Sequence, residues 1–274
     1  MNRLPFFATL IDAVTLLWRG RKDFLAFAYL PVIANALLGV ALQISLPNPM
    51  PQEPEALIAA LSGTTVAIWL AAIIAGIGFY IVFAIAWHRH CLLPGEVTTI
   101  GAALRWRSRH WRFFGMTMAL TMAALGAAII ANFIVGAIAG ALLGQGQGLG
   151  VLIPVLVTFA VLTQFMRLLP VFPAIAVDDR SVTLGAAWRL TRGNGATLFM
   201  LLFTLSLALA IIHQVLLAIW LAALGSFIAE GSPLALFALA LLVQLITFIG
   251  IALTTTIVSI AYRDLKAQAG GGTV

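Results

Sequence analysis

The side chains in this sequence that most often ligate metal ions lie close together at His88, His90 and Cys91. Imidazole and thiolate are common ligands of zinc, whose structural sites are tetrahedral and use four of them. Residues two apart on a helix point away from each other, and the sequence offers no second cluster to complete the set. We therefore predict no metal site and no cofactor. Cys91 is the only cysteine, so no disulfide forms within the chain.

Acid-base chemistry is the second kind that the sequence could support. Glu96, Asp178 and Asp179 are carboxylates outside the apolar stretches. A hydrolytic site would also need a nucleophile, such as a serine flanked by glycines, or a histidine that acts with a carboxylate. The sequence pairs none of these with the three acids, and charged residues in links are usually only solvated. We predict that the protein is not an enzyme; convergence of Glu96 and Asp178 in one pocket would argue that it is.

Arginine supplies the strongest candidates for binding, because its planar guanidinium forms paired hydrogen bonds with phosphate and carboxylate oxygens. The candidate contacts for a lipid headgroup or a protein partner are Arg105, Arg107, Arg109, Arg112, Arg167, Arg189 and Arg192. We expect Pro170 and Pro173 to break the helix that contains Arg167 and so to place this arginine at the membrane interface. There it would pair with Asp178, with Asp179 or with a lipid phosphate.

Several polar side chains lie at similar depth inside the apolar stretches: Asn35, Asn132, Gln164, His213, Gln214 and Gln244. They could line a path for a solute or hold a substrate headgroup. Alternatively, they hydrogen-bond between helices, each bond contributing about 0.6 to 2 kcal/mol; we favour this interpretation. No Asp or Glu lies inside these stretches, which argues against a transporter coupled to protons or cations and against His213 as a proton relay.

Long apolar stretches must position all of these residues. Of the 274 residues, 62% are hydrophobic and 9% are charged, whereas soluble domains have about 25% charged residues. A membrane-crossing helix needs roughly 20 apolar residues. Six stretches are long enough: 24–46, 62–87, 113–143, 151–169, 197–225 and 234–261. We predict an all-α, polytopic integral membrane bundle of six transmembrane helices, with residues 1–274 as a single domain.

The basic residues fall on one side of these six predicted spans. All fifteen lysines and arginines lie before the first span, in or beside the link between the second and third spans or the link between the fourth and fifth spans, or after the sixth span. The other three links, at 47–61, 144–150 and 226–233, contain no lysine or arginine. Short basic links stay cytoplasmic, so we predict that both termini are cytoplasmic. The formal charge of +6 then reflects orientation and anionic lipid headgroups rather than a nucleic-acid partner.

Three similar units make up the predicted layout, each an interfacial helix followed by two spans. Residues 100–105 match residues 184–189 at an offset of 84 positions, as both read apolar-Gly-Ala-Ala-apolar-Arg. Before the first span, Phe6, Leu10 and Leu17 recur at helical spacing. We therefore predict amphipathic interfacial helices before spans one, three and five. Whether the units arose by duplication stays open, because shared physical demands can produce the same pattern.

One part of the sequence resembles a known family. The resemblance is carried by Arg167-Leu168-Leu169-Pro170, by Pro173-Ala174-Ile175-Ala176-Val177-Asp178 and by the stretch from Leu184-Gly185-Ala186-Ala187-Trp188-Arg189 to Asn194. It resembles a stretch of bacterial six-span membrane proteins similar to the membrane domain attached to some glycerophosphoryl diester phosphodiesterases. This resemblance implies a location in the bacterial cytoplasmic (inner) membrane and contact with lipids. It carries no catalytic residue across, because the soluble phosphodiesterase barrel is not in this sequence.

Two functional hypotheses follow. The first is a non-enzymatic membrane protein that binds lipids, or acts as a scaffold for a protein partner, through basic interfacial helices at the cytoplasmic face. The alternative is a transporter that moves a small or amphipathic solute through the polar layer. A tightly filled bundle would favour the first and an open vestibule the second. The glycines at positions 136, 140 and 144 permit close helix packing, either within the chain or in a homo-oligomer.

Overall fold

The computed structural model describes residues 3–46, 53, 55–56, 61–96, 100–143, 149–230 and 232–270. Much of the links predicted at 47–61 and 144–150 lies outside these residues. The helices are α1 (Phe6–Arg19), α2 (Arg21–Ser45), α4 (Gly63–Leu92), α5 (Ile100–Leu104), α6 (Ser108–Leu143), α7 (Leu149–Met166), α8 (Val171–Ala176), α9 (Leu184–Leu190), α10 (Gly195–Ala229) and α11 (Pro233–Gly270). Six helical segments are long and apolar enough to cross a membrane, which confirms the predicted all-α, six-span membrane protein.

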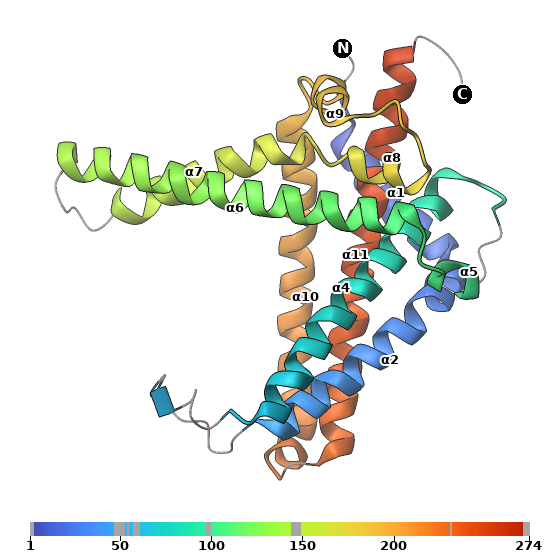
Figure 1. Cartoon of the computed structure of the whole chain (residues 1–274), viewed down its shortest axis with the longest axis vertical. Coiled ribbons are helices and arrows are strands. Elements are labelled where there is room, and N and C mark those ends of the chain that lie inside the picture. Colours follow the sequence, from blue (N-terminus) through green and yellow to red (C-terminus); the bar gives the residue numbers. More distant parts are fainter. Residues whose placement is uncertain are drawn as a thin grey trace.

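The long helices form three hairpins, α2/α4, α6/α7 and α10/α11 (Figure 1). Helix α11 packs along both α2 and α4 and thereby joins the first hairpin to the third. The α6/α7 hairpin contacts α4, α8 and α10 near its base, and its far end extends away from the other long helices (Figure 1). Both chain termini and the bases of the hairpins lie in the upper part of Figure 1, which we call the basic end.

Short helices precede the first, third and fifth spans, as the repeat pattern predicted: α1, α5 and α9. Helix α1 packs against α11 and buries Thr9 and Ala13. On its other side, Phe7, Ile11 and Trp18 are exposed. A helix with one face on the protein and apolar side chains directed outward is typical of the membrane interface. The order of short helix and hairpin thus occurs three times, with α8 as an addition before α9.

Aromatic side chains fill the core where α2, α4 and α11 meet. Trp87 is fully buried, stacks on Phe83 and donates its indole N–H to the Thr256 hydroxyl at 2.8 Å. His88 is buried too, and its Nδ1 lies 2.8 Å from Ser259 Oγ. In the described ranges, no group of three or more His, Cys, Asp or Glu side chains is arranged to hold a metal ion. His88 therefore belongs to the packing of α4 against α11.

The fourth span is broken near Arg167. Helix α7 ends at Met166, residues 167–170 form a turn, and α8 begins at Val171. Proline disfavours the helical conformation in the residue before it, so Pro170 explains the break, as predicted. Pro173 does not break a helix, because it lies in the first turn of α8, where a backbone N–H has no intrahelical partner to lose.

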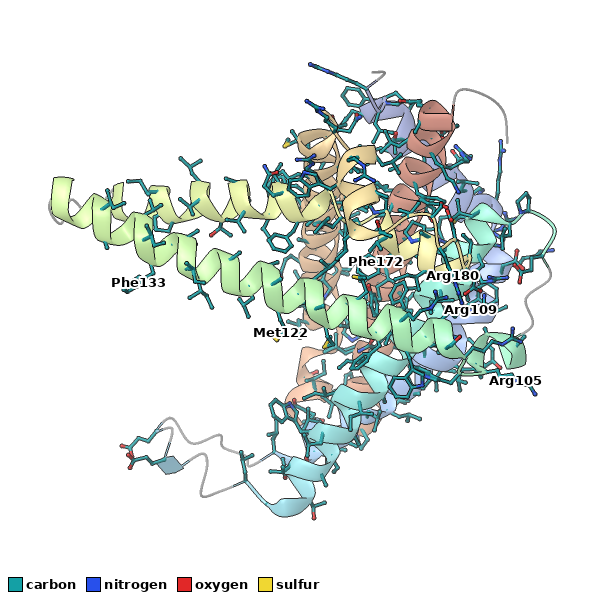
Figure 2. The ribbon with its side chains drawn as sticks, turned by 45° about the horizontal axis from the view of Figure 1, so that its top comes forward. Arg105, Arg109, Met122, Phe133, Phe172 and Arg180 are labelled. Carbon is teal, nitrogen blue, oxygen red and sulfur yellow. The ribbon has the colours of Figure 1, made fainter. Side chains whose placement is uncertain are left out.

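The α6/α7 hairpin carries apolar side chains on its outer surface. Met122 and Phe133 project from α6 and are 59% and 78% exposed (Figure 2). Within the hairpin, Asn132 Nδ2 donates to Thr158 Oγ1 at 2.9 Å and joins α6 to α7. A bilayer would cover this apolar surface with lipid chains.

Candidate functional site: two arginine clusters

Six arginines at the basic end form two separate groups, each beside a hollow. The first group, which we call the paired cluster, consists of Arg89, Arg109 and Arg112 with Glu96 and Asp178. The second, which we call the open cavity, lies between α7, α9 and the start of α10. It is lined by Thr163, Gln164, Arg167, Trp188, Arg189, Arg192, Gly193, Gly195 and Ala196. The two groups differ in what balances their positive charge.

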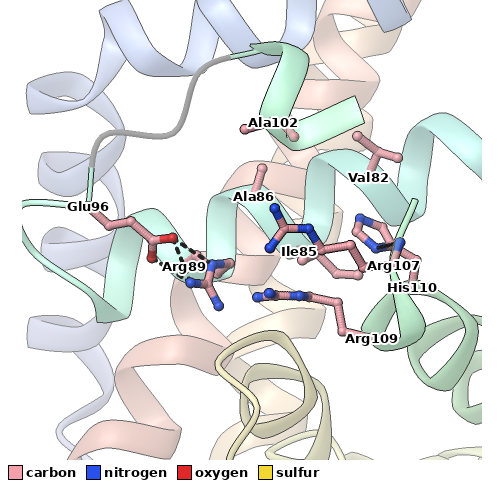
Figure 3. A pocket seen from close by; sticks show the side chains of 10 residues that line it. Val82, Ile85, Ala86, Arg89, Glu96, Ala102, Arg107, Arg109 and His110 are labelled. Carbon is pink, nitrogen blue, oxygen red and sulfur yellow. Dashed lines mark hydrogen bonds and ion pairs between the residues drawn. The ribbon is translucent and has the colours of Figure 1, made fainter. Parts of the chain in front are cut away.

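Arg89 occupies the centre of the paired cluster, beside a hollow of about 80 Å³ (Figure 3). Its Nη2 lies 2.6 Å and 2.8 Å from the two carboxylate oxygens of Glu96. Its Nη1 donates to the carbonyl of Ala176 at 2.9 Å, and Arg109 donates to the same carbonyl at 3.3 Å. Ala176 is the last residue of α8, where carbonyls lack intrahelical partners. The two guanidinium groups therefore supply this carbonyl with the hydrogen-bond donors that it lacks within the helix.

Asp178 balances the other arginines of the paired cluster. Its carboxylate accepts a hydrogen bond from Arg112 at 2.5 Å and lies 3.2 Å from Arg109. Its backbone has a φ of 58°, in the left-handed region that Asp and Asn tolerate better than most residues. The Arg109 side chain is only 14% exposed. These ion pairs therefore anchor the start of α6 to the chain that leaves α8.

The four arginines predicted between 105 and 112 do not form one surface. Arg109 and Arg112 are held by Asp178, whereas Arg105 and Arg107 are exposed. Arg107 lines the small hollow beside Arg109 (Figure 3). Glu96 also lines this hollow, but Asp178 is outside its lining. Glu96 and Asp178, whose convergence would argue for an enzyme, are thus each engaged by arginine and do not line the same hollow.

The open cavity has a volume of about 610 Å³, and none of the described residues that line it is acidic. Arg167, Arg189 and Arg192 form no ion pair with any residue in the described ranges. Three positive charges therefore face one hollow without a carboxylate to balance them. Such an arrangement favours an anion from outside the chain.

Contacts on three sides hold the Arg167 side chain in the open cavity. Its guanidinium carbon lies 3.7 Å from the centroid of the Trp188 ring, and its Nη2 donates to the Trp188 carbonyl at 2.9 Å. Its methylene stem rests on Gly195, where a Cβ atom would come within 2.8 Å of Arg167 Cγ. Its Nε is buried and has no hydrogen-bond partner among the described residues. The position of this charge is therefore fixed, while its donors are incompletely used.

The two carboxylates expected beside Arg167 lie elsewhere, one of them in the paired cluster. The other, Asp179, accepts hydrogen bonds from Lys266 at 2.6 Å, from Ser181 at 2.6 Å and from Tyr262. Burial alone would raise the pKa of Asp179, but these hydrogen bonds outweigh it and lower the pKa below its usual range. Asp179 thus ties the end of α11 to the α8–α9 link. The predicted pairing of Arg167 with either carboxylate is wrong.

The link from α9 to α10 forms part of the wall of the open cavity. Thr191 is buried and donates to the Arg167 carbonyl at 3.0 Å, which joins this link to the turn after α7. Gly193 has a φ of 81°, a conformation that favours glycine. Asn194 Oδ1 accepts the backbone N–H of Leu4 at 2.8 Å and does not cap α10. The first N–H groups of α10 therefore lack a side-chain cap at the point where an anion would enter.

The predicted polar residues lie on separate elements. Asn132 bonds within the α6/α7 hairpin, and Gln164 lies in the open cavity, with its Oε1 3.4 Å from Arg167. His213 lines a groove between α4, α10 and α11. Three further residues make no hydrogen bond within the described parts of the chain: Asn35, Gln214 and Gln244. Gln164 and His213 thus line different hollows, and a shared polar layer of the six residues stays a prediction.

Sequence reasoning missed Arg89, Trp188 and Gly195 as site residues. A signal for Trp188 was present, because it replaces Leu104 of the matching segment, and an aromatic ring is what a neighbouring guanidinium can stack on. Gly195 directly follows the stretch that carries the family resemblance. Its role depends on the position of Arg167, nearly thirty residues away, so sequence spacing could not reveal it.

No protein-family model, curated protein or solved structure matches this chain. The resemblance of residues 167–194 to bacterial six-span membrane proteins therefore stays a prediction. What the protein does must be inferred from the geometry of its sites.

Proposed function

We propose that this integral membrane protein is not an enzyme and binds anionic lipid, with the lipid phosphate in the open cavity. The observation that carries the proposal is the presence of three arginines around one cavity with no carboxylate in its lining. Guanidinium groups bind phosphate oxygens through paired hydrogen bonds. The uncapped start of α10 adds favourable partial charge at the same point.

The position of the cavity favours a lipid phosphate over a free one. The cavity lies where α7 ends and α10 begins, beside two of the candidate spans, and we place it near the level of the lipid headgroups. Trp188 is 38% exposed beside it, and tryptophan is enriched at the height of lipid headgroups. The one-sided distribution of Lys and Arg supports a cytoplasmic basic end, in what the family resemblance implies is a bacterial inner membrane.

Native mass spectrometry of the full chain, released from nanodiscs with equal amounts of phosphatidylglycerol and phosphatidylcholine, tests this proposal. Phosphatidylglycerol should be retained preferentially. The double variant Arg189→Gln/Arg192→Gln should bind it roughly thirtyfold more weakly, because each arginine beside an anionic headgroup contributes about 1 kcal/mol. Both side chains are exposed, so the fold should persist.

The matched control is Arg19→Gln/Arg105→Gln, which removes the same charge from exposed positions outside the open cavity. Its affinity should change less than threefold if the site is specific, because salt screens the long-range attraction between exposed charges. An equal loss in both double variants would contradict a defined site. Displacement of the lipid by millimolar inorganic phosphate would instead identify a soluble anion as the ligand.

Transport of a small or amphipathic solute through a mid-membrane polar layer is the second candidate. Gln164 and His213 line two different hollows, so neither hollow alone joins them into one path. An acidic segment of a protein partner could engage the same arginines. Retention of lipid by the purified chain alone, without any partner, would favour the lipid.

A further inference from the structure

A second hollow lies near the middle of the long helices and contains no charged side chain. It is a groove of about 510 Å³ between α4, α10 and α11. Its polar lining includes Tyr80 from α4, Ser206 and His213 from α10, and Thr254 and Thr255 from α11. These residues lie near the centres of spans that extend over 63–92, 195–228 and 233–269. The groove is therefore separate from the open cavity and at the depth of the hydrocarbon.

The hydrogen-bonding capacity of the polar side chains in this groove is largely unused by the described residues. None of the five side chains makes a hydrogen bond in the part of the chain that the structure describes. Thr255 is only 5% exposed, and it is one of the residues that line the groove. By contrast, Thr247 in the same groove donates to the Val243 carbonyl at 2.8 Å, the usual way in which a helical threonine satisfies itself.

Unsatisfied polar groups are costly in hydrocarbon, because no water is present to bond to them. Lipid acyl chains offer no hydrogen-bonding atoms. The exposed side of the α6/α7 hairpin from a second copy would not help either, since it presents apolar side chains such as Met122 and Phe133. The occupant must therefore carry its own hydrogen-bonding atoms.

The occupant must also be uncharged. The lining contains no Asp, Glu, Lys or Arg, so a charged ligand would enter the hydrocarbon without a counter-ion. Hydroxyl groups both donate and accept, and the imidazole of His213 does the same through its two nitrogens. The rest of the lining is apolar, including Leu209, Val243 and Ile246. A volume of about 510 Å³ lies within the range of small-molecule sites, about 300 to 1,000 Å³.

From these contacts we propose that the groove between α4, α10 and α11 binds an uncharged amphipathic molecule, with a hydroxyl or ester carbonyl bonded to Thr254, Thr255 and His213 and with apolar chains along α10 and α11. This site is distinct from the phosphate site of the proposed function. It needs no arginine, and it selects for the absence of charge where the open cavity selects for a negative charge.

Photocrosslinking of the purified full chain in nanodiscs with a diazirine-bearing diacylglycerol tests the site. This probe is uncharged and carries one hydroxyl and two ester carbonyls on apolar chains. Peptide mapping should place crosslinks near residues 206–213 and 247–255. Unlabelled diacylglycerol should compete, whereas a hydrocarbon of equal length should not.

The double variant Thr254→Val/Thr255→Val removes two hydroxyls without changing side-chain volume much. It should raise the concentration of diacylglycerol needed for half-maximal competition roughly tenfold, as expected for two hydrogen bonds. Thr247→Val is the matched control, because its hydroxyl is already satisfied by Val243, and it should have an effect below twofold. His213→Phe gives an independent test from α10 and should weaken competition about threefold.

Three results would overturn the site. The hydrocarbon could compete as well as diacylglycerol, the double variant could leave competition unchanged, or crosslinks between two copies could show that the α6/α7 hairpin of a second copy fills the groove. Unfolding temperatures of the variants within a degree or two of the parent would show that the fold persists. Anionic lipid binding by these variants should equal that of the parent. Failure of the groove is thus distinguishable from failure of the open cavity.

Discussion

The paired cluster and the open cavity each contain three arginines at the basic end, and yet they present opposite surroundings to them. In the paired cluster, two carboxylates and the carbonyl at the end of α8 surround the guanidinium groups. In the open cavity, an indole ring and the uncapped start of α10 take those places. The negative groups of the paired cluster balance the positive charge of its arginines, whereas the surroundings in the open cavity leave that charge unbalanced.

From this comparison we propose that clustered arginines have two separate uses in this membrane protein. Where carboxylates of the chain reach them, they join elements: α6 to α8, and the end of α4 to Glu96. Where no carboxylate reaches them, they hold a site ready for an external anion. Loss of a partner should therefore reduce stability in the paired cluster and reduce binding in the open cavity.

The largest expected effect is on stability, from Asp178→Asn. Asn keeps the left-handed backbone conformation but leaves Arg109 and Arg112 without a counter-charge. Because Asp178 is 45% exposed, solvent screening limits the loss to about 2 kcal/mol. Thermal unfolding of the purified protein in detergent should show it. Phosphatidylglycerol affinity should stay within twofold of the parent, and a large loss of binding would break the division between the two clusters.

The next effect in size is on binding, from Gly195→Ala. A Cβ at this position would meet the Arg167 stem at 2.8 to 2.9 Å, so the arginine must leave its place on Trp188. Phosphatidylglycerol affinity should fall about tenfold, which corresponds to about 1.4 kcal/mol. Gly185→Ala is the control, because its added Cβ would meet only Arg189 Nη1 at an ordinary 3.7 Å. Similar affinities for both variants would show that Arg167 is not held as the structure indicates.

Asp179→Asn tests a third carboxylate that already has its partners. The hydrogen bonds from Lys266, Ser181 and Tyr262 lower the pKa of Asp179, so ionised Asp179 stabilises the folded state at neutral pH. This contribution is complete above the unfolded-state pKa of about 4 and is lost as the pH falls toward the lower folded-state value. At pH 7 the variant should lose about 1 kcal/mol of stability. The difference from the parent should shrink when unfolding is measured below about pH 4.

Much of the fold could be predicted from the sequence, because membrane spans depend on local composition. Apolar runs of about 20 residues gave the six spans, and the match between 100–105 and 184–189 located two short helices, α5 and α9. The turn at Arg167 followed from Pro170 alone. These features need only neighbouring residues, so no knowledge of tertiary contacts was required.

The division of the arginines could not be predicted, because it depends on which distant carboxylates reach them. Arg112 meets Asp178 across 66 positions of sequence, and Arg89 meets the Ala176 carbonyl across 87. Seven arginines therefore looked equivalent in the sequence, although only three of them face the open cavity. The same limit applies to the mid-depth polar residues, since equal depth in separate spans does not place side chains on facing sides.

Trp188→Leu carries the smallest expected effect and sharpens the comparison most. It gives the segment at 184–189 the same leucine that the matching segment has at Leu104. Removal of the ring beneath Arg167 should weaken phosphatidylglycerol binding about threefold, because a cation–π contact at an accessible site contributes about 0.5 to 1 kcal/mol. Trp188→Phe should keep most of the affinity in the same native mass spectrometry assay. If the leucine variant bound the lipid as tightly as the parent, net charge alone would distinguish the two clusters, and the Trp188 ring would have no part in positioning Arg167.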